Sequence, residues 1–96
     1  TGNTGLPKEF MLYQNYPNPF NPSTKIRFDI SGRSAAKTFL FVYDILGREV
    51  AALVNDQLWP GTYEYTWDAS NNPSGIYFYK ITAGEFTAVN KMVLLK

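Results

Sequence analysis

The chain has 96 residues, of which 45% are apolar and 18% charged, with a formal net charge of +1 and neither cysteine nor histidine. These values fit one folded domain and differ from those of a disordered segment. They exclude disulfides, thiol nucleophiles, structural zinc and a histidine base, and they give no long-range field for nucleic acid or an anionic membrane. No apolar run approaches the roughly 18 residues of a membrane-spanning helix.

The first nine residues are expected to be a linker stub, followed by a single domain over residues 10–96. The opening Thr1-Gly2-Asn3-Thr4-Gly5 is small and polar, and the chain does not begin with Met. We therefore expect a C-terminal domain taken from a longer protein. A proteolytic cut is expected within residues 1–8, because exposed polar segments are where proteases act.

Seven short strand signals follow, separated by residues that favour turns. In residues 24–30, for example, apolar side chains alternate with Lys25, Arg27 and Asp29, which predicts one buried face and one charged face in water. The strands are expected over residues 10–14, 24–30, 37–43, 48–54, 62–67, 76–82 and 86–95.

The third strand is unusual because both of its faces are apolar. Phe39, Phe41 and Tyr43 face one way, and the two aliphatic residues between them face the other. The strands are short, and turns come about every 8–12 residues, which predicts an all-β fold: a seven-stranded immunoglobulin-like antiparallel β-sandwich. No helical pattern alternates with the strands, so a parallel α/β sheet is excluded.

The segment Tyr16-Pro17-Asn18-Pro19-Phe20-Asn21-Pro22 is predicted to form a stiff corner between the first two strands. Its prolines fix φ near about −65° and favour an extended conformation in the residues before them. Asn18 and Asn21 are expected to hydrogen-bond to the backbone, and Phe20 is expected to close the end of the sandwich.

No catalytic site is predicted. Most of the eight carboxylates lie at outward strand positions or in turns, whereas glycoside hydrolysis needs two that face each other across a cleft. The loop from Asp68 to Asn72 could offer oxygen ligands to calcium, but its spacing matches no EF-hand, and such residues commonly form Asx turns. No cofactor or metal is expected, and the calcium question stays open for this loop.

The final six residues, Lys91-Met92-Val93-Leu94-Leu95-Lys96, are an apolar strand between two lysines. Most domains end in a few loose polar residues. An apolar strand at this position is expected either to pair in a sheet or to be recognised by another molecule.

Four segments in this order resemble the C-terminal sorting domain of type IX secretion cargo, in the type A form of Bacteroidetes and their relatives. The related immunoglobulin-like domain of flagellar hook-capping proteins shares the middle two. The four segments are residues 16–24, 42–50, 73–79 and 91–96.

The resemblance implies a non-catalytic sorting signal that directs a larger cargo protein to the cell surface or the medium. The cargo would cross the inner membrane by a separate signal, and the outer-membrane translocon would recognise the sorting domain in the periplasm. A sortase component would then cleave the domain. The implied partners are the translocon, the sortase and the upstream cargo domain, with no nucleic acid and no membrane insertion.

In that family the C-terminal strand and a Gly-x-Tyr segment are tied to recognition. Tyr77 is also expected in the core, and residues 92–95 are expected to be half-buried. Matched by position, the recognition residues are Gly75, Tyr77, Lys91, Met92, Val93, Leu94, Leu95 and Lys96. Structural roles are expected for Pro17, Asn18, Pro19, Phe20, Asn21, Pro22, Asp44 and Gly47, the last two in a β-turn. Deletion of residues 91–96 is expected to leave the cargo in the periplasm.

Two alternatives remain open. One is an immunoglobulin-like spacer, and the other is a carbohydrate-binding module that uses Phe39, Phe41, Tyr43 and Trp59. Phe39 and Phe41 depart from the pattern of the resembled family, in which one of these positions is often polar. This departure favours an additional contact surface, for example with a neighbouring domain.

Overall fold

The computed structural model describes residues 5–96, so the part of the expected linker at residues 1–4 lies outside the described residues. Throughout the described residues the secondary structure is β, and no helix there is long and apolar enough to cross a membrane. The strands are β1 (Met11–Leu12), β2 (Ser23–Ile30), β3 (Ala36–Tyr43), β4 (Glu49–Leu58), β5 (Gly61–Asp68), β6 (Gly75–Ala83) and β7 (Phe86–Leu94).

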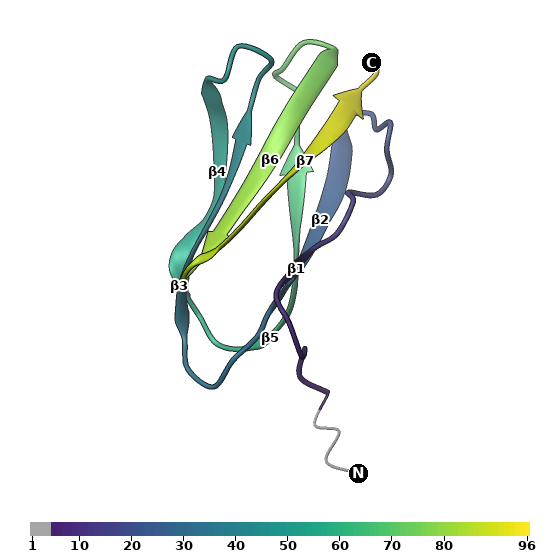
Figure 1. Cartoon of the computed structure of the whole chain (residues 1–96). Coiled ribbons are helices and arrows are strands. Elements are labelled where there is room, and N and C mark those ends of the chain that lie inside the picture. Colours follow the sequence, from purple (N-terminus) through teal and green to yellow (C-terminus); the bar gives the residue numbers. More distant parts are fainter. Residues whose placement is uncertain (1–4) are drawn as a thin grey trace.

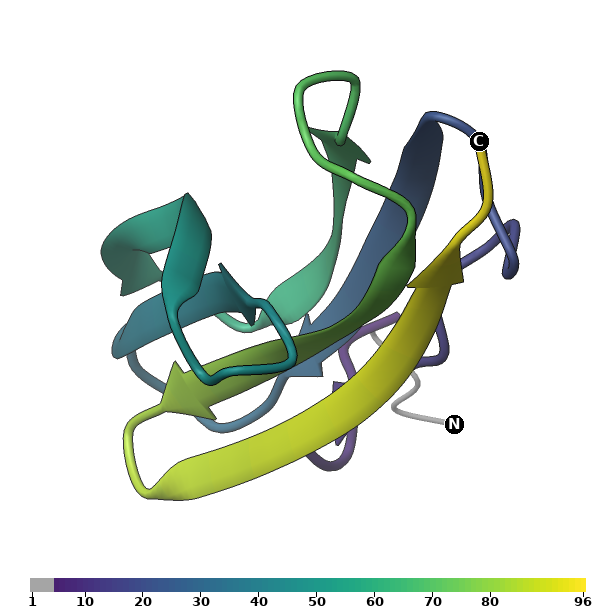
Figure 2. The same cartoon turned by 90° about the horizontal axis from the view of Figure 1, so that it is seen from above.

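The strands form two antiparallel sheets, one in the order β1-β2-β5 and the other in the order β4-β3-β6-β7. Figure 1 shows the molecule along its length, with the first described residues before β1 at one end and the C-terminus at the other. The view from above in Figure 2 shows the sheets as two layers. The prediction of an all-β fold with seven antiparallel strands is confirmed.

The core lies between the sheets and is built from the alternating side chains of each strand. In β2, Ile26, Phe28 and Ile30 are fully buried. In β3 the aliphatic residues Leu40 and Val42 point into the core, as the alternation requires. The aromatic residues of β3 therefore lie on the outer side of its sheet, where they are half-buried.

The prediction that all three charged residues of β2 face water is wrong for Asp29, which is buried. It is only 7% exposed. Its carboxylate accepts hydrogen bonds from the Tyr13 hydroxyl at 2.5 Å and from the Thr62 hydroxyl at 2.8 Å. Because a buried carboxylate is tolerated only when hydrogen-bonded, these two hydroxyls explain why Asp29 can lie at the sheet surface without reaching water.

Two strand boundaries also differ from the prediction. β1 is two residues long rather than five, and β4 continues to Leu58 rather than ending at residue 54. The extension of β4 places Leu58 opposite Ala36 and buries it. The polar residues between 55 and 57 concealed this strand in the sequence, because they lie on an edge strand where water replaces the missing neighbour.

Candidate functional site

The β3–β4 turn is held together by one carboxylate. Asp44 accepts hydrogen bonds from the backbone N–H groups of Leu46 and Arg48 and from the Arg48 guanidinium, at 2.8–3.0 Å. The hydrogen bond from the Arg48 backbone N–H is the main cause that lowers the pKa of Asp44 below its usual value. Gly47 takes a φ of 83°, which other residues rarely adopt. The turn leaves the side chains of Ile45 and Leu46 about two-thirds or more exposed, at 67% and 73%.

The loop from β5 to β6 forms an Asx turn at Asp68. This carboxylate accepts the Ser70 backbone N–H at 2.9 Å and also the Ser70 hydroxyl, and the hydroxyl is the main cause that lowers the pKa of Asp68. Within residues 5–96, no group of three or more Asp, Glu, His or Cys side chains is arranged to hold a metal ion. Farther along, the Tyr77 hydroxyl donates to the Pro73 carbonyl at 2.6 Å and fixes the end of the loop.

The β3–β4 turn and the β5–β6 loop together line a groove of about 290 Å³. The β3–β4 turn and the β5–β6 loop lie at the same end of the molecule as the C-terminus (Figure 1). The groove therefore brings together two motifs that are about 30 residues apart in the sequence. Its apolar walls come from Ile45, Leu46, Val50, Pro73 and Ile76.

The proline–asparagine segment lies along the free edge of β7. Its three X–Pro bonds are cis. The backbone of Phe20 pairs with β7, donating to the Val93 carbonyl and accepting from the Leu95 N–H, each at 3.0 Å. The Asn18 side chain accepts the Val93 N–H at 3.0 Å, and the Gln14 side chain donates to the Lys91 carbonyl at 2.8 Å. We call residues 14–20 the strap, because they cover the last part of an otherwise open sheet edge.

The strap is anchored in the core by aromatic packing. Phe20 is buried, its ring lies 5.8 Å from that of Trp67, and Trp67 in turn meets Tyr77 edge-on at 5.3 Å. The proline–asparagine segment, through Phe20, and the Gly-x-Tyr segment, through Tyr77, therefore pack into one aromatic cluster around Trp67. Edge-on pairs of this kind contribute about 0.5–1.5 kcal/mol beyond the burial of their area.

A second anchor was missed by the sequence interpretation. The buried Asn15 side chain donates to the Thr24 hydroxyl at 2.9 Å and to the Pro17 carbonyl at 3.2 Å, and its backbone N–H donates to the Tyr79 hydroxyl at 2.7 Å. Asn15 directly precedes the proline-rich motif and Thr24 closes it. Two hydrogen-bonding residues that flank a rigid corner were the only signal available in the sequence.

The eight predicted recognition residues separate into three groups by burial. Tyr77, Met92 and Leu94 are buried in the core, so their side chains offer a partner almost no exposed surface in the folded domain. Val93 is half-buried. The remaining four, Gly75, Lys91, Leu95 and Lys96, are exposed. The expectation that residues 92–95 would all be half-buried is corrected, because strand alternation sends even-numbered residues inward.

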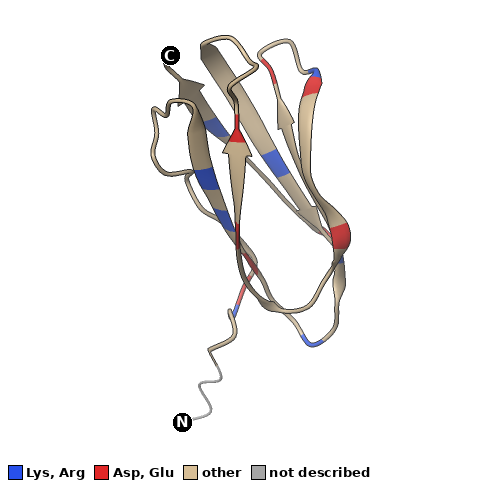
Figure 3. Ribbon diagram, turned by 180° about the vertical axis from the view of Figure 1, so that it is seen from behind, with Lys and Arg blue, Asp and Glu red and all other residues tan. Residues whose placement is uncertain are grey.

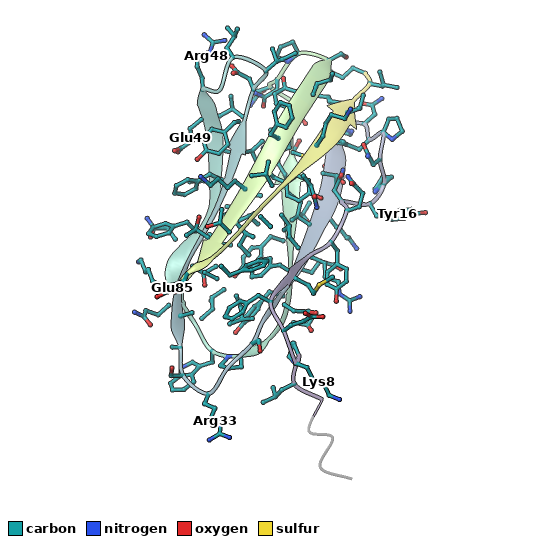
Figure 4. All side chains as sticks on the ribbon, viewed as in Figure 1. Lys8, Tyr16, Arg33, Arg48, Glu49 and Glu85 are labelled. Carbon is teal, nitrogen blue, oxygen red and sulfur yellow. The ribbon has the colours of Figure 1, made fainter. Side chains whose placement is uncertain are left out.

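Lys96 ties the end of the chain to the β5–β6 loop. Its backbone N–H donates to the Ser74 hydroxyl at 2.9 Å, and its ammonium donates to the Ser70 carbonyl at 2.5 Å. Three further apolar side chains, those of Ile45, Leu46 and Ile76, are also exposed at this end, although the sequence interpretation did not select them. We define the motif-end surface as Ile45, Leu46, Gly75, Ile76, Leu95 and Lys96. In Figure 4 Arg48 marks this end, whereas Lys8 and Arg33 mark the opposite one.

In a comparison with protein families, the family described as the secretion system C-terminal sorting domain matches residues 14–95. The matched range starts at the first residue of the strap and ends at Leu95, so it contains the first three motifs whole and the fourth without Lys96. A search of curated proteins gives no match.

Proposed function

The chain belongs to the family of secretion system C-terminal sorting domains, and from this premise we propose which surface carries its signal. The family is that of sorting signals for type IX secretion, so the function of this chain is to mark an attached cargo protein for that secretion machinery. Export to the cell surface or the medium follows from the same membership.

The proposed signal is the motif-end surface. The observation that carries this proposal is that exposed apolar side chains gather where the family's motifs meet, although nothing in the fold requires them there. Ile45 and Leu46 lie in a turn held by the hydrogen bonds of Asp44 with the backbone and with Arg48, and none of these hydrogen bonds uses their side chains. Exposed apolar clusters of this kind commonly mark protein interaction sites.

The buried motif residues have a supporting role in this proposal. Phe20, Trp67 and Tyr77 fix the strap and the β5–β6 loop, and the fixed backbone presents the exposed side chains. Recognition by the translocon would thus read a rigid folded surface. A rigid surface loses little conformational freedom on binding, which favours affinity.

The remaining parts of the proposal follow the known use of such signals. Residues 10–96 are the sorting domain, and residues 1–9 are the linker to the cargo. Recognition takes place in the periplasm, a sortase component cuts the linker, and the domain itself catalyses no reaction. The rings of Phe10 and Phe86 stack with their centres 5.3 Å apart, which supports a domain boundary near residue 10.

The topology is proposed to be immunoglobulin-like. The strand order β1-β2-β5 in one sheet and β4-β3-β6-β7 in the other supports this assignment. It resembles the constant-type arrangement with the fourth strand moved from the first sheet to the second.

The test is a reporter with an inner-membrane signal peptide, followed by residues 1–96, in a secretion-competent strain and in a translocon-null strain. The wild-type fusion is expected on the surface or in the medium of the competent strain only. The double substitution Ile45→Asp/Leu46→Asp should reduce export at least about tenfold, because a residue at the centre of an interface typically contributes about 2 kcal/mol or more.

Trp59→Asp is the matched control. Trp59 is 64% exposed and follows β4, at the end of the molecule away from the motifs. This variant should be exported like the wild type. Equal export of all three fusions would refute the motif-end surface while leaving the sorting function intact. Retention of the wild-type fusion in both strains would refute the sorting function of this chain.

A further inference from the structure

The outer face of the four-stranded sheet carries a second set of aromatic side chains. Phe39, Phe41 and Tyr43 occupy three successive outward positions of β3, and Tyr43 lies opposite Phe78 of β6. We call these four residues the aromatic face. β3 lies between β4 and β6, so the aromatic face runs along the middle of the sheet and not along its edge.

These side chains do not belong to the core. The core residues of β3 are Leu40 and Val42, which are fully buried on the other side, whereas the four aromatic residues are half-buried. Strands with two apolar faces are typical of sheets that are covered on both sides. Here the outer side is uncovered and forms a shallow groove of about 270 Å³, lined by Phe39, Phe41, Tyr43, Lys80 and Thr82.

Basic residues border the aromatic face. Lys80 is paired with Phe41 and Lys91 with Phe78, and the Lys37 ammonium lies 5.3 Å from the centre of the Phe39 ring. The acidic residue paired with a member of the face is Glu49, opposite Tyr43. Figure 3 shows basic residues along β6 and β7 and acidic residues on β4. The charge around the aromatic face is therefore mainly positive.

We propose that the aromatic face is a docking surface for an acidic protein segment that carries apolar side chains. This inference goes beyond the sorting signal, because it concerns a different surface. The apolar side chains would fill the groove, and carboxylates would meet Lys80 and Lys91. Electrostatic complementarity of this kind steers association and selects partners by charge.

Two other occupants fit the observations less well. A second copy of the chain would bring lysines against lysines across the same face. A sugar ring is best held by coplanar aromatic rings, whereas the planes of Phe39 and Phe41 are tilted by 58°. Phenylalanine also lacks the polar group that tyrosine and tryptophan can offer to a hydroxyl.

The test uses the whole 96-residue chain and a fluorescein-labelled peptide of alternating glutamate and leucine. Fluorescence anisotropy should show saturable binding that weakens as salt is raised, because exposed charge pairs are screened. Lys80→Glu/Lys91→Glu should weaken the binding at least about tenfold. Lys25→Glu, on the other sheet, is the matched control and should leave the affinity unchanged.

A charge-swapped peptide of alternating lysine and leucine provides the decisive comparison. It should bind the Lys80→Glu/Lys91→Glu variant and not the wild type. Because both lysines are exposed, the variant is expected to remain folded, and its circular dichroism spectrum verifies this. Phe39→Ser/Phe41→Ser should abolish binding of the glutamate–leucine peptide to the otherwise wild-type chain.

The proposal is overturned if the wild type does not bind the glutamate–leucine peptide, or if the Lys80→Glu/Lys91→Glu variant binds it equally well. Equal affinity for polyglutamate would also overturn it, because the aromatic side chains would then have no part in binding. Two further results would overturn it. One is that the chain binds an acidic polysaccharide and not the peptide. The other is that the chain forms a dimer and that Phe39→Ser/Phe41→Ser abolishes this dimer.

Discussion

The hydroxyl of Tyr79 joins segments that are more than 60 residues apart. It donates to the Tyr13 carbonyl and accepts from the Asn15 backbone N–H, each at 2.7 Å, and it accepts from the Asn90 side chain at 3.2 Å. Burial raises the pKa of Tyr79, so the neutral hydroxyl persists throughout the physiological range. One buried atom thus fixes the start of the strap to the centre of the four-stranded sheet.

Tyr79→Phe is expected to lower the free energy of unfolding by about 1–3 kcal/mol, because the Asn15 N–H is left buried without an acceptor. Urea denaturation measures the change. Tyr65→Phe is the control, since the half-buried Tyr65 takes part in ring stacking with Phe28 and the substitution keeps the ring. If the two variants lose equal stability, the hydrogen bonds of Tyr79 are not what holds the strap.

Asp44 makes the β3–β4 turn sensitive to acid. Its pKa in the folded domain lies below the usual 3.8, so the folded state favours the ionised form. The resulting stabilisation is fully present above pH 3.8 and is lost as the pH falls through the lowered pKa. Thermal melts of the wild type and Asp44→Asn should therefore differ near neutral pH and converge in strong acid. A gap that stays constant down to strong acid would contradict this account.

Strand β7 depends on the strap for the last part of its hydrogen bonding. On one side, residues 91–94 pair with β6. On the other side, residues 91–95 form hydrogen bonds with Gln14, Asn18 and Phe20. The strap thus does for residues 91–95 what a fifth strand would do for the sheet. In this chain the proline–asparagine segment and the C-terminal strand therefore complete each other's backbone hydrogen bonds.

Asn18→Ala tests this arrangement. The Val93 amide loses its acceptor and should exchange its hydrogen roughly three- to tenfold faster, the effect of losing one net hydrogen bond of about 0.5–1.5 kcal/mol. Native-state hydrogen exchange followed by NMR measures the rate. The Leu95 amide, which donates to the Phe20 carbonyl, is the internal reference and should change less. Equal acceleration at both amides would indicate that the whole strap detaches.

On the scale of the whole molecule, the C-terminal strand is both structural and exposed. Met92 and Leu94 complete the core, while Leu95 and Lys96 reach the motif-end surface. A loss of export after deletion of residues 91–96 is therefore ambiguous, because the deletion removes core residues as well as exposed ones. Substitution of single exposed side chains separates recognition from folding.

Deletion of residues 91–96 is expected to unfold the domain. Losing a buried Met or Leu side chain costs about 2–5 kcal/mol, and the stability of a whole domain is only about 5–15 kcal/mol. The circular dichroism and NMR spectra of the truncated chain should be those of an unfolded chain. Leu95→Asp should keep the native spectra and lower only export. A folded truncated chain would show that β7 contributes little to the core.

The sequence by itself determined the strands, most of their inward faces, and the family. Strand alternation depends on neighbouring residues only, and it placed Phe28, Leu40 and Tyr79 on consistent faces. The motifs of the family are likewise local runs of residues. These features are encoded within each segment and need no knowledge of the partner strand.

Only the tertiary structure decided which segments meet. Phe20 and Leu94 pair although 74 positions separate them in the chain, and no local pattern encodes that pairing. The burial of Asp29 also depends on hydroxyls supplied by two other segments. The same holds for the motif-end surface, because exposure is set by what packs against a residue and not by its type. The pairing of distant segments reflects packing of the whole core, which local sequence does not contain.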